Sequence, residues 1–72
     1  MKKKNIVILG STGSIGKQTL EVVKKDKKKF NIMLLSTNSN LKEISKQIRI
    51  FRPKSIIITN KKKFIFFKKK NK

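Results

Sequence analysis

A glycine-rich turn directly after a short apolar run is the feature that most constrains the fold of this chain. Residues 4–16 read K-N-I-V-I-L-G-S-T-G-S-I-G, and the glycines are Gly10, Gly13 and Gly16. A continuous apolar run of this length is typical of a strand buried in a parallel sheet. The segment therefore predicts a strand over residues 5–9, a tight turn, and a helix that starts near Ser14.

Such a turn can bring main-chain N–H groups close to a phosphate. Glycine has no Cβ to block the approach, and the N-terminus of the following helix carries partial positive charge. The spacing here is G-x-x-G-x-x-G, which is wider in its first gap than the usual dinucleotide fingerprint G-x-G-x-x-G. We interpret the turn as a dinucleotide site at the first strand–helix junction of a doubly wound fold. The alternative is that the glycines only make the bend.

The same segment also resembles a nucleoside-triphosphate loop, G-x-x-x-x-G-K-[ST]. Residues 11–18 read S-T-G-S-I-G-K-Q, so Ser11 replaces the first glycine and Gln18 replaces the hydroxyl residue that would hold Mg²⁺. Because both ends of the pattern fail, we do not favour this alternative.

The helix predicted over residues 14–25 has one apolar face. The face consists of Ile15, Thr19, Val22 and Val23, which follow one another at steps of four, three and one residues. We expect this face to pack on the sheet. The lysines at the end of the helix complement its dipole and form a solvated basic surface.

A second strand and a second helix follow. The apolar run at residues 30–36 predicts the strand. Asn40, followed three positions later by Glu43, resembles a capping box at the start of the helix. The apolar face of this second helix consists of Leu41, Ile44, Ile48 and Phe51.

Pro53 marks the end of the second helix, and residues 56–58 predict a third strand. The resulting order is β-α-β-α-β with right-handed crossovers. This order predicts an α/β, Rossmann-like parallel sheet that is the N-terminal half of a dinucleotide-binding domain. Three strands and two helices leave one sheet edge unpaired and one sheet face without helices.

Beyond Asn60 the alternation of strands and helices stops. Residues 61–72 read K-K-K-F-I-F-F-K-K-K-N-K and show neither a helical nor a strand period. We therefore divide the chain into a partial NADP-binding, Rossmann-like domain at residues 1–60 and a lysine-rich, low-complexity tail at residues 61–72. A complete dinucleotide-binding domain needs about twice the length of this chain, so we interpret the chain as part of a larger protein or as a truncated product.

The composition is strongly basic, with 21 Lys and Arg residues against 3 acidic residues. A net charge of +18 favours binding to phosphate backbones. Residue types with A/T-rich codons are abundant, however, and alanine is absent, which indicates a genomic cause for the lysines. The lysines are not interleaved with stacking aromatics, since Tyr and Trp are absent. A small basic nucleic-acid-binding protein is the leading alternative function, but we do not favour nucleic acid as the partner.

Neither cysteine nor histidine occurs in the chain. Disulfides, thiolate metal sites and the commonest general base are therefore excluded. The basic N-terminus resembles the start of a signal peptide, but the apolar run behind it is too short. No segment approaches the ~20 apolar residues that a membrane span requires. We expect a cytoplasmic protein without a membrane partner.

The second predicted strand ends in a polar segment without a carboxylate. An NAD site usually has an Asp or Glu here, which binds the ribose hydroxyls. Residues 36–40 read S-T-N-S-N, so a 2′-phosphate would meet hydroxyl and amide donors, with Lys42 nearby, and no fixed negative charge. We therefore favour NADP over NAD. The alternative is that these residues form only a loop and a helix cap.

Two segments resemble one enzyme family. Residues 9–23, L-G-S-T-G-S-I-G-K-Q-T-L-E-V-V, and residues 51–58, F-R-P-K-S-I-I-I, resemble the N-terminal part of 1-deoxy-D-xylulose 5-phosphate reductoisomerases. The resemblance covers roughly residues 3–60. Semialdehyde dehydrogenases and extended short-chain dehydrogenases share the glycine spacing but not the S-T-G-S-I filling. Another NADP-dependent oxidoreductase, such as a semialdehyde dehydrogenase, therefore remains a further alternative.

The resemblance implies an NADPH site in this part of the chain. It assigns the residues from Thr12 to Ile15 to the pyrophosphate and nearby ribose, and the loop after the second strand to the 2′-phosphate. The family often has glycine, a basic residue and asparagine in that loop, so only Asn40 of this chain matches. The candidate cofactor-binding residues are Gly10, Ser11, Thr12, Gly13, Ser14, Ile15, Asn38, Ser39 and Asn40.

The resemblance also implies an activity that needs more than this chain contains. Enzymes of the family convert 1-deoxy-D-xylulose 5-phosphate to 2-C-methyl-D-erythritol 4-phosphate for isoprenoid synthesis, as NADP-dependent homodimers that hold Mg²⁺ or Mn²⁺ with carboxylates. The acids of this chain, Glu21, Asp26 and Glu43, are predicted on or beside helix surfaces. We therefore expect no catalytic residue, metal site, sugar-phosphate site, dimer or reductoisomerase activity in the 72-residue chain alone.

Overall fold

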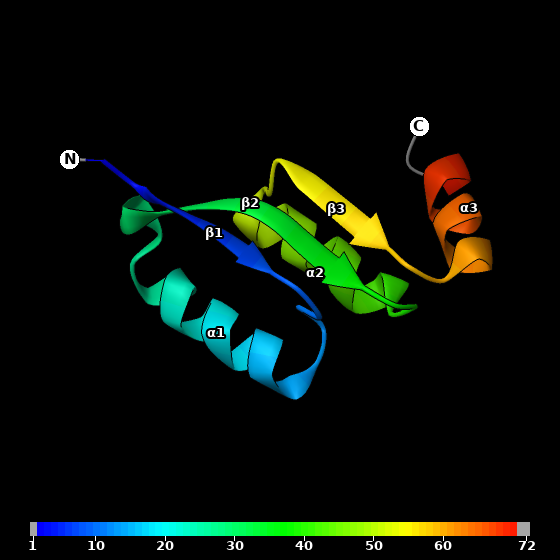
Figure 1. Cartoon of the computed structure of the whole chain (residues 1–72), viewed down its shortest axis with the longest axis horizontal. Helices are drawn as coiled ribbons and strands as arrows, with labels where there is room; N and C mark the ends of the chain where they lie inside the picture. Colours follow the sequence, from blue (N-terminus) through cyan, green and yellow to red (C-terminus); the bar gives the residue numbers. More distant parts are fainter. Residues whose placement is uncertain (1, 71–72) are drawn as a thin grey trace.

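The computed structural model describes residues 2–70, which form one parallel sheet and the helices beside it (Figure 1). The strands lie in the order β1-β2-β3, and both neighbouring pairs are parallel. This arrangement confirms the predicted α/β, Rossmann-like β-α-β-α-β fold. The elements are β1 (Lys4–Ile8), α1 (Ser14–Lys25), the 3₁₀ turn η1 (Lys27–Lys29), β2 (Phe30–Thr37), α2 (Leu41–Phe51), β3 (Ser55–Ile58) and α3 (Lys61–Lys70).

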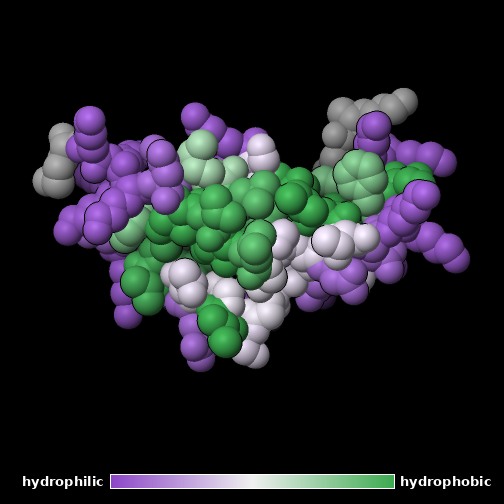
Figure 2. Space-filling view, viewed as in Figure 1, coloured by the Kyte–Doolittle hydropathy of each residue, from purple (hydrophilic) through white to green (hydrophobic). Residues whose placement is uncertain are grey.

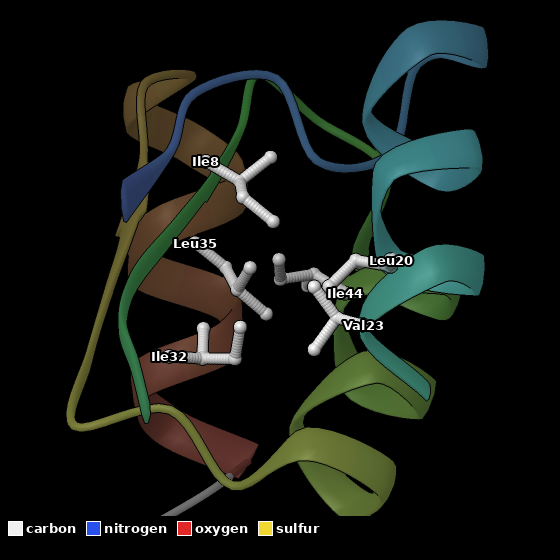
Figure 3. Close-up of a cluster of buried hydrophobic side chains, with 6 residues drawn as sticks. All are labelled: Ile8, Leu20, Val23, Ile32, Leu35 and Ile44. Carbon is white, nitrogen blue, oxygen red and sulfur yellow. The ribbon is translucent and has the colours of Figure 1, made fainter. Parts of the chain in front are cut away.

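The core lies between the sheet and the helices α1 and α2 (Figure 3). Leu35 of β2 and Ile44 of α2 have no exposed surface. Burying a side chain of this kind contributes about 1.5–3 kcal/mol. The buried apolar cluster consists of Ile8, Leu20, Val23, Ile32, Leu35 and Ile44.

A bulge in the pairing of β1 with β2 allows two residues of β2 to reach this core. Ile32 and Leu35 are both buried although they are three positions apart, whereas a regular strand alternates every two positions. The register shifts between Ile6 and Val7, because Ile6 pairs with Ile32 and Val7 pairs with Leu34. The extra residue in β2 returns Leu35 to the face that α1 and α2 cover.

Helix α1 spans the predicted residues, but it turns a different face toward the sheet. Gly16, Leu20 and Val23 are buried. A Cβ atom at position 16 would clash with main-chain atoms of the glycine turn, so only glycine allows the helix to lie this close to the turn. This contact sets the rotation of α1 about its axis. The prediction was correct for Val23 and wrong for the exposed members of the predicted face, which are Ile15, Thr19 and Val22.

Helix α2 has the predicted apolar face. Ile44 is fully buried, and half-buried residues on the same face complete the packing against the core: Leu41, Ile48 and Phe51. The helix ends at Phe51, and its C-cap residue, Arg52, adopts the left-handed conformation with a φ of 48° directly before Pro53. A proline disfavours helical geometry at the residue before it, which explains the predicted position of this helix end.

Residues 61–70 form helix α3, whereas the sequence predicts no regular structure there. The expectation was wrong because α3 has no apolar period: Phe67 packs against the core cluster, while Phe64, Ile65 and Phe66 are exposed. The side chain of Asn60 caps the helix by accepting a hydrogen bond from the Lys63 N–H at 3.0 Å. Residues 71–72 of the predicted tail lie outside the described residues, and the division of the chain at Asn60 stays a prediction.

The sheet face opposite α1 and α2 carries no helix within residues 2–70 (Figure 1). Figure 2 shows apolar atoms gathered over the strands on this side of the molecule. Val7 of β1 and Ile57 of β3 are 57% and 45% exposed. The β1 edge of the sheet is also unpaired among these residues, since β1 neighbours only β2.

Candidate nucleotide-binding site

The glycine turn begins where β1 ends, at the carboxyl edge of the sheet. Gly10 has a φ of 70°, a left-handed conformation that glycine adopts without a steric penalty. The Gly13 N–H donates to the Gly10 carbonyl oxygen at 3.0 Å and closes the turn. Gly13 is also the N-cap of α1, and no side chain caps the helix at this end. The first N–H groups of α1 are therefore left open.

The end of β2 binds the turn from one side. Ser36 accepts two main-chain hydrogen bonds: the Gly10 N–H donates to its Oγ at 2.8 Å, and the Ser11 N–H donates to its carbonyl oxygen at 2.7 Å. The Ser11 hydroxyl donates to the same carbonyl oxygen at 3.2 Å. The hydroxyls of Thr12 and Thr37 lie 2.7 Å apart. The glycine turn and the end of β2, which are distant in the sequence, are thus joined at the carboxyl edge of the sheet.

Four main-chain N–H groups of the turn and of the start of α1 have no hydrogen-bond partner within residues 2–70. They belong to Thr12, Ser14, Ile15 and the buried Gly16. Ser14 and Ile15 are the first two residues of α1, where an N–H cannot bond within the helix. Both residues are exposed, and Thr12 is half-buried. Unpaired N–H groups and the helix dipole together attract an anion, and a phosphate fits this arrangement.

The six predicted residues of the turn, from Gly10 to Ile15, lie together, but they differ in what they can offer a ligand. The N–H groups of Gly10 and Ser11 are already bonded to Ser36. Ser11 is also fully buried, and its hydroxyl is bonded. These two residues therefore shape the turn, while the segment from Thr12 to Ile15 forms its accessible rim.

The loop after β2 contains the other three predicted residues, and all three are exposed. Asn38 Oδ1 accepts a hydrogen bond from the Thr59 hydroxyl at 2.8 Å. Asn40 Oδ1 accepts one from the Glu43 N–H at 3.1 Å, which confirms the predicted N-cap of α2. Ser39 lies between them, and its carbonyl oxygen accepts a bond from the N–H of the first residue of α2. The two asparagine oxygens are thus engaged within the protein, and their NH₂ groups remain as donors.

Gln47 of α2 is absent from the residues that the sequence predicts for the site. Its side chain is 3% exposed, and its Nε2 donates to the Ser11 carbonyl oxygen at 2.9 Å. The signal in the sequence is a polar residue on the apolar face of α2, three positions after Ile44. Buried polar side chains are almost always hydrogen-bonded, so such a position indicates a specific partner. Ser36 and Thr37 give a weaker signal, because polar residues commonly end a strand.

A groove of about 620 Å³ runs beside the turn, between β1 and the start of α1. Its lining is mostly apolar, from Ile6 to Leu9 and Ile15, and the glycine turn forms one end. A second cavity, of about 480 Å³, lies at the opposite end of the strands, and its lining includes Lys and Arg side chains among apolar residues. There Lys27 Nζ donates to the Ile50 carbonyl oxygen at 3.3 Å, so at least one of these cations satisfies the C-terminal end of α2. We assign this second cavity no ligand.

The acidic side chains do not form a metal site. Within residues 2–70 no three of the side chains that commonly ligate metals lie close enough to hold an ion. Asp26 pairs with Lys29 at 3.3 Å, and Glu43 accepts a hydrogen bond from Gln47 at 3.3 Å. The divalent metal implied by the resemblance therefore does not fit this part of the chain. In the same residues, every helix is too short or too polar to cross a bilayer.

Comparison with known proteins gives one family. A family model described as 1-deoxy-D-xylulose 5-phosphate reductoisomerase matches residues 6–72. Curated relatives with this name include those of Pelagibacter ubique, 45% identical over 62 residues, and Caldanaerobacter subterraneus, 48% identical over 60 residues. The matches cover 86% and 83% of this chain, and 16% of each relative. The chain thus spans about one sixth of the length of these relatives.

A solved structure shows the same fold. It is the 1-deoxy-D-xylulose 5-phosphate reductoisomerase from Zymomonas mobilis in complex with NADPH, and its TM-score to this chain is 0.89. The match covers 94% of this chain and 18% of that protein, at 24% sequence identity. At this identity the likeness establishes the fold.

Proposed function

This chain belongs to the 1-deoxy-D-xylulose 5-phosphate reductoisomerase family, and on that premise we propose that its glycine turn binds the diphosphate of NADPH. The observation that carries the proposal is the set of unpaired N–H groups on Thr12, Ser14 and Ile15. They lie at the carboxyl edge of a parallel sheet, where doubly wound folds bind nucleotides. Bound NADPH would supply a hydride for reduction.

The residues of the turn take two roles in this proposal. Thr12, Gly13, Ser14 and Ile15 contact the diphosphate and the adjoining ribose, because they form the accessible rim of the turn. Gly10 and Ser11 determine the path of the main chain, because their own donors are bonded to the end of β2.

The loop after β2 would bind the 2′-phosphate. Asn38 and Asn40 use their side-chain oxygens within the protein, so each presents an NH₂ donor, and Ser39 adds an exposed hydroxyl. Lys42 on the first turn of α2 is exposed and adds a positive charge. An NAD site would use a carboxylate at this place, and residues 36–40 contain none. The loop therefore favours NADPH over NADH.

For the complete enzyme we propose the activity of the family: conversion of 1-deoxy-D-xylulose 5-phosphate to 2-C-methyl-D-erythritol 4-phosphate in isoprenoid synthesis, by a cytoplasmic homodimer that uses Mg²⁺ or Mn²⁺. This chain matches 16% of the length of these relatives. It contributes cofactor binding, and sugar-phosphate and metal binding belong to other parts of the enzyme. The family match disfavours both alternatives, a nucleic-acid-binding protein and a semialdehyde dehydrogenase.

The variant Ser14→Pro tests the proposal by deleting one N–H group of the turn. Proline is well accepted at the first position of a helix, and the preceding Gly13 has φ −80° and ψ 174°, which suits the residue before a proline. The helix should therefore form as before. Ser14→Ala is the matched control, since it removes the hydroxyl and keeps the N–H.

Calorimetric titration of both variants with NADPH gives the measurement. A hydrogen bond to a charged group is worth about 1.5–3 kcal/mol, so Ser14→Pro should bind NADPH at least about tenfold more weakly than Ser14→Ala. Wild-type chain should also prefer NADPH over NADH. Equal affinities of the two variants for NADPH would count against the turn as the diphosphate site, and equal affinities of the wild type for NADPH and NADH would count against the 2′-phosphate loop.

A further inference from the structure

We propose that Gln47 is a positioning residue that directs the Thr12 N–H toward the cofactor's diphosphate. This inference rests on the proposed NADPH site and assigns a role to a residue on α2, outside the turn itself. Gln47 lies 36 positions after Ser11 in the sequence, yet its Nε2 reaches the Ser11 carbonyl oxygen at 2.9 Å. The bond is buried, because Ser11 and Gln47 are 0% and 3% exposed.

The peptide bond between Ser11 and Thr12 connects this contact to the ligand side of the turn. A trans peptide unit is planar, so its carbonyl and its N–H point in opposite directions. The Ser11 carbonyl is drawn toward α2 by Gln47, and the Thr12 N–H must then point away from α2. The preceding peptide is fixed independently, since the Ser11 N–H donates to the Ser36 carbonyl oxygen at 2.7 Å. With Ser36 on one side and Gln47 on the other, the Thr12 N–H is left with little freedom.

The surroundings of Gln47 determine which end of its amide faces the turn. Nε2 lies near two acceptors, the Ser11 carbonyl oxygen at 2.9 Å and Glu43 Oε2 at 3.3 Å. A flipped amide would place an oxygen against both acceptors, so Nε2 is the group that faces them. The other end, Oε1, is buried without a hydrogen-bond partner among the described residues. A buried unpaired acceptor lowers stability, and an apolar side chain at this position would avoid that cost. The amide therefore serves the turn rather than the packing of the core.

Gln47→Met tests this role in the 72-residue chain. Methionine has a similar length and fills the same space without a donor. Gln18→Met is the matched control, because Gln18 is exposed on α1. Each protein is titrated with two probes, NADPH and adenosine 2′-monophosphate. The second probe carries the 2′-phosphate but no diphosphate.

We expect Gln47→Met to bind NADPH about tenfold more weakly, which is the effect of one lost charge-assisted hydrogen bond. Its affinity for adenosine 2′-monophosphate should stay within about twofold of wild type, and Gln18→Met should leave both affinities unchanged. An equal loss for both probes would show that Gln47 only supports the fold, and an unchanged NADPH affinity would show that it does not position the turn. Either result overturns the inference.

A second measurement keeps the inference separate from the proposed function. Residual dipolar couplings of the unliganded chain report the direction of each N–H bond. Gln47→Met should change the coupling of Thr12 and leave those of Leu35 and Ile44 in the core as they are in wild type. If wild type fails to bind NADPH, the proposed function is wrong, and an altered Thr12 coupling still supports the orienting contact. An unaltered Thr12 coupling overturns that contact whatever the chain binds.

Discussion

Gly16→Ala tests how closely α1 lies against the glycine turn. A Cβ at this position would come closest to the Gly10 carbonyl oxygen, and it would lie 2.6 Å from Ser11 Cα and 2.9 Å from the Ser11 carbonyl carbon. All three are main-chain atoms, which cannot rotate away as the end of a side chain can. The methyl group therefore forces α1 away from the turn or deforms the turn.

Two opposing effects determine how far Gly16→Ala lowers the free energy of unfolding. Alanine favours a helix over glycine by about 0.5–1 kcal/mol. Overpacking in a dense core costs about 1–3 kcal/mol, and rigid main-chain contacts place Gly16 at the upper end of that range. We expect a net loss of about 2 kcal/mol in the free energy of unfolding. For a chain of this size that corresponds to a decrease in Tm of about 8–16 °C.

Urea unfolding followed by circular dichroism at 222 nm measures the loss. Gly13→Ala is the matched control, because a Cβ at position 13 would lie 3.4 Å from the Gly10 carbonyl oxygen, an ordinary contact. Gly13 also has a negative φ of −80°. The free energy of unfolding of the Gly13→Ala control should fall by less than about 1 kcal/mol. A Gly16→Ala chain as stable as Gly13→Ala would refute the close packing of α1 on the turn.

Four further outcomes follow from the structure. Leu35→Ala should lower the free energy of unfolding by about 2–5 kcal/mol in urea, because the side chain is fully buried; a loss below that of the exposed Val7→Ala would contradict the core. Asn40→Ala should lower it by about 1 kcal/mol through loss of the α2 cap, and an unchanged midpoint would argue against the cap. Added NaCl should raise Tm in calorimetry, since it screens the self-repulsion of a net charge of +18; a constant Tm would contradict this. The purified chain should not consume NADPH with 1-deoxy-D-xylulose 5-phosphate and Mg²⁺, and measurable turnover would contradict the absence of a metal site in residues 2–70.

Local signals allowed the strands, the glycine turn and the bounds of α1 to be predicted from the sequence. The apolar run of β1 and the spacing of Gly10 and Gly13 each indicate one structure without reference to the rest of the chain. The inner face of α1 was predicted incorrectly because a count of apolar residues gives no weight to Gly16. That residue determines the helix position through the side chain it lacks. Helix α3 was missed because one aromatic residue, Phe67, provides its contact with the core.

The candidate site likewise contains residues that the sequence predicts and residues that it does not. The turn residues are adjacent in the sequence and form a recognisable motif. Ser36 and Gln47 support the turn from 25 to 36 positions away, and both bind main-chain N–H or carbonyl groups of the turn, which most residue types provide. Ser36 and Gln47 therefore leave only a faint trace in the sequence. Their roles depend on the fold, which brings β2 and α2 beside the turn.

The most direct test of the account is a titration of ¹⁵N-labelled chain with NADPH, followed by NMR at about 0.3 M NaCl, where nonspecific attraction of anions is screened. We expect saturable shifts that are largest for the N–H groups of Thr12, Ser14 and Ile15, which lie unpaired in the free chain. Shifts confined to the basic cavity around Arg49 and Arg52 at the opposite end of the strands, with the turn unchanged, would rule out the glycine turn as the NADPH site.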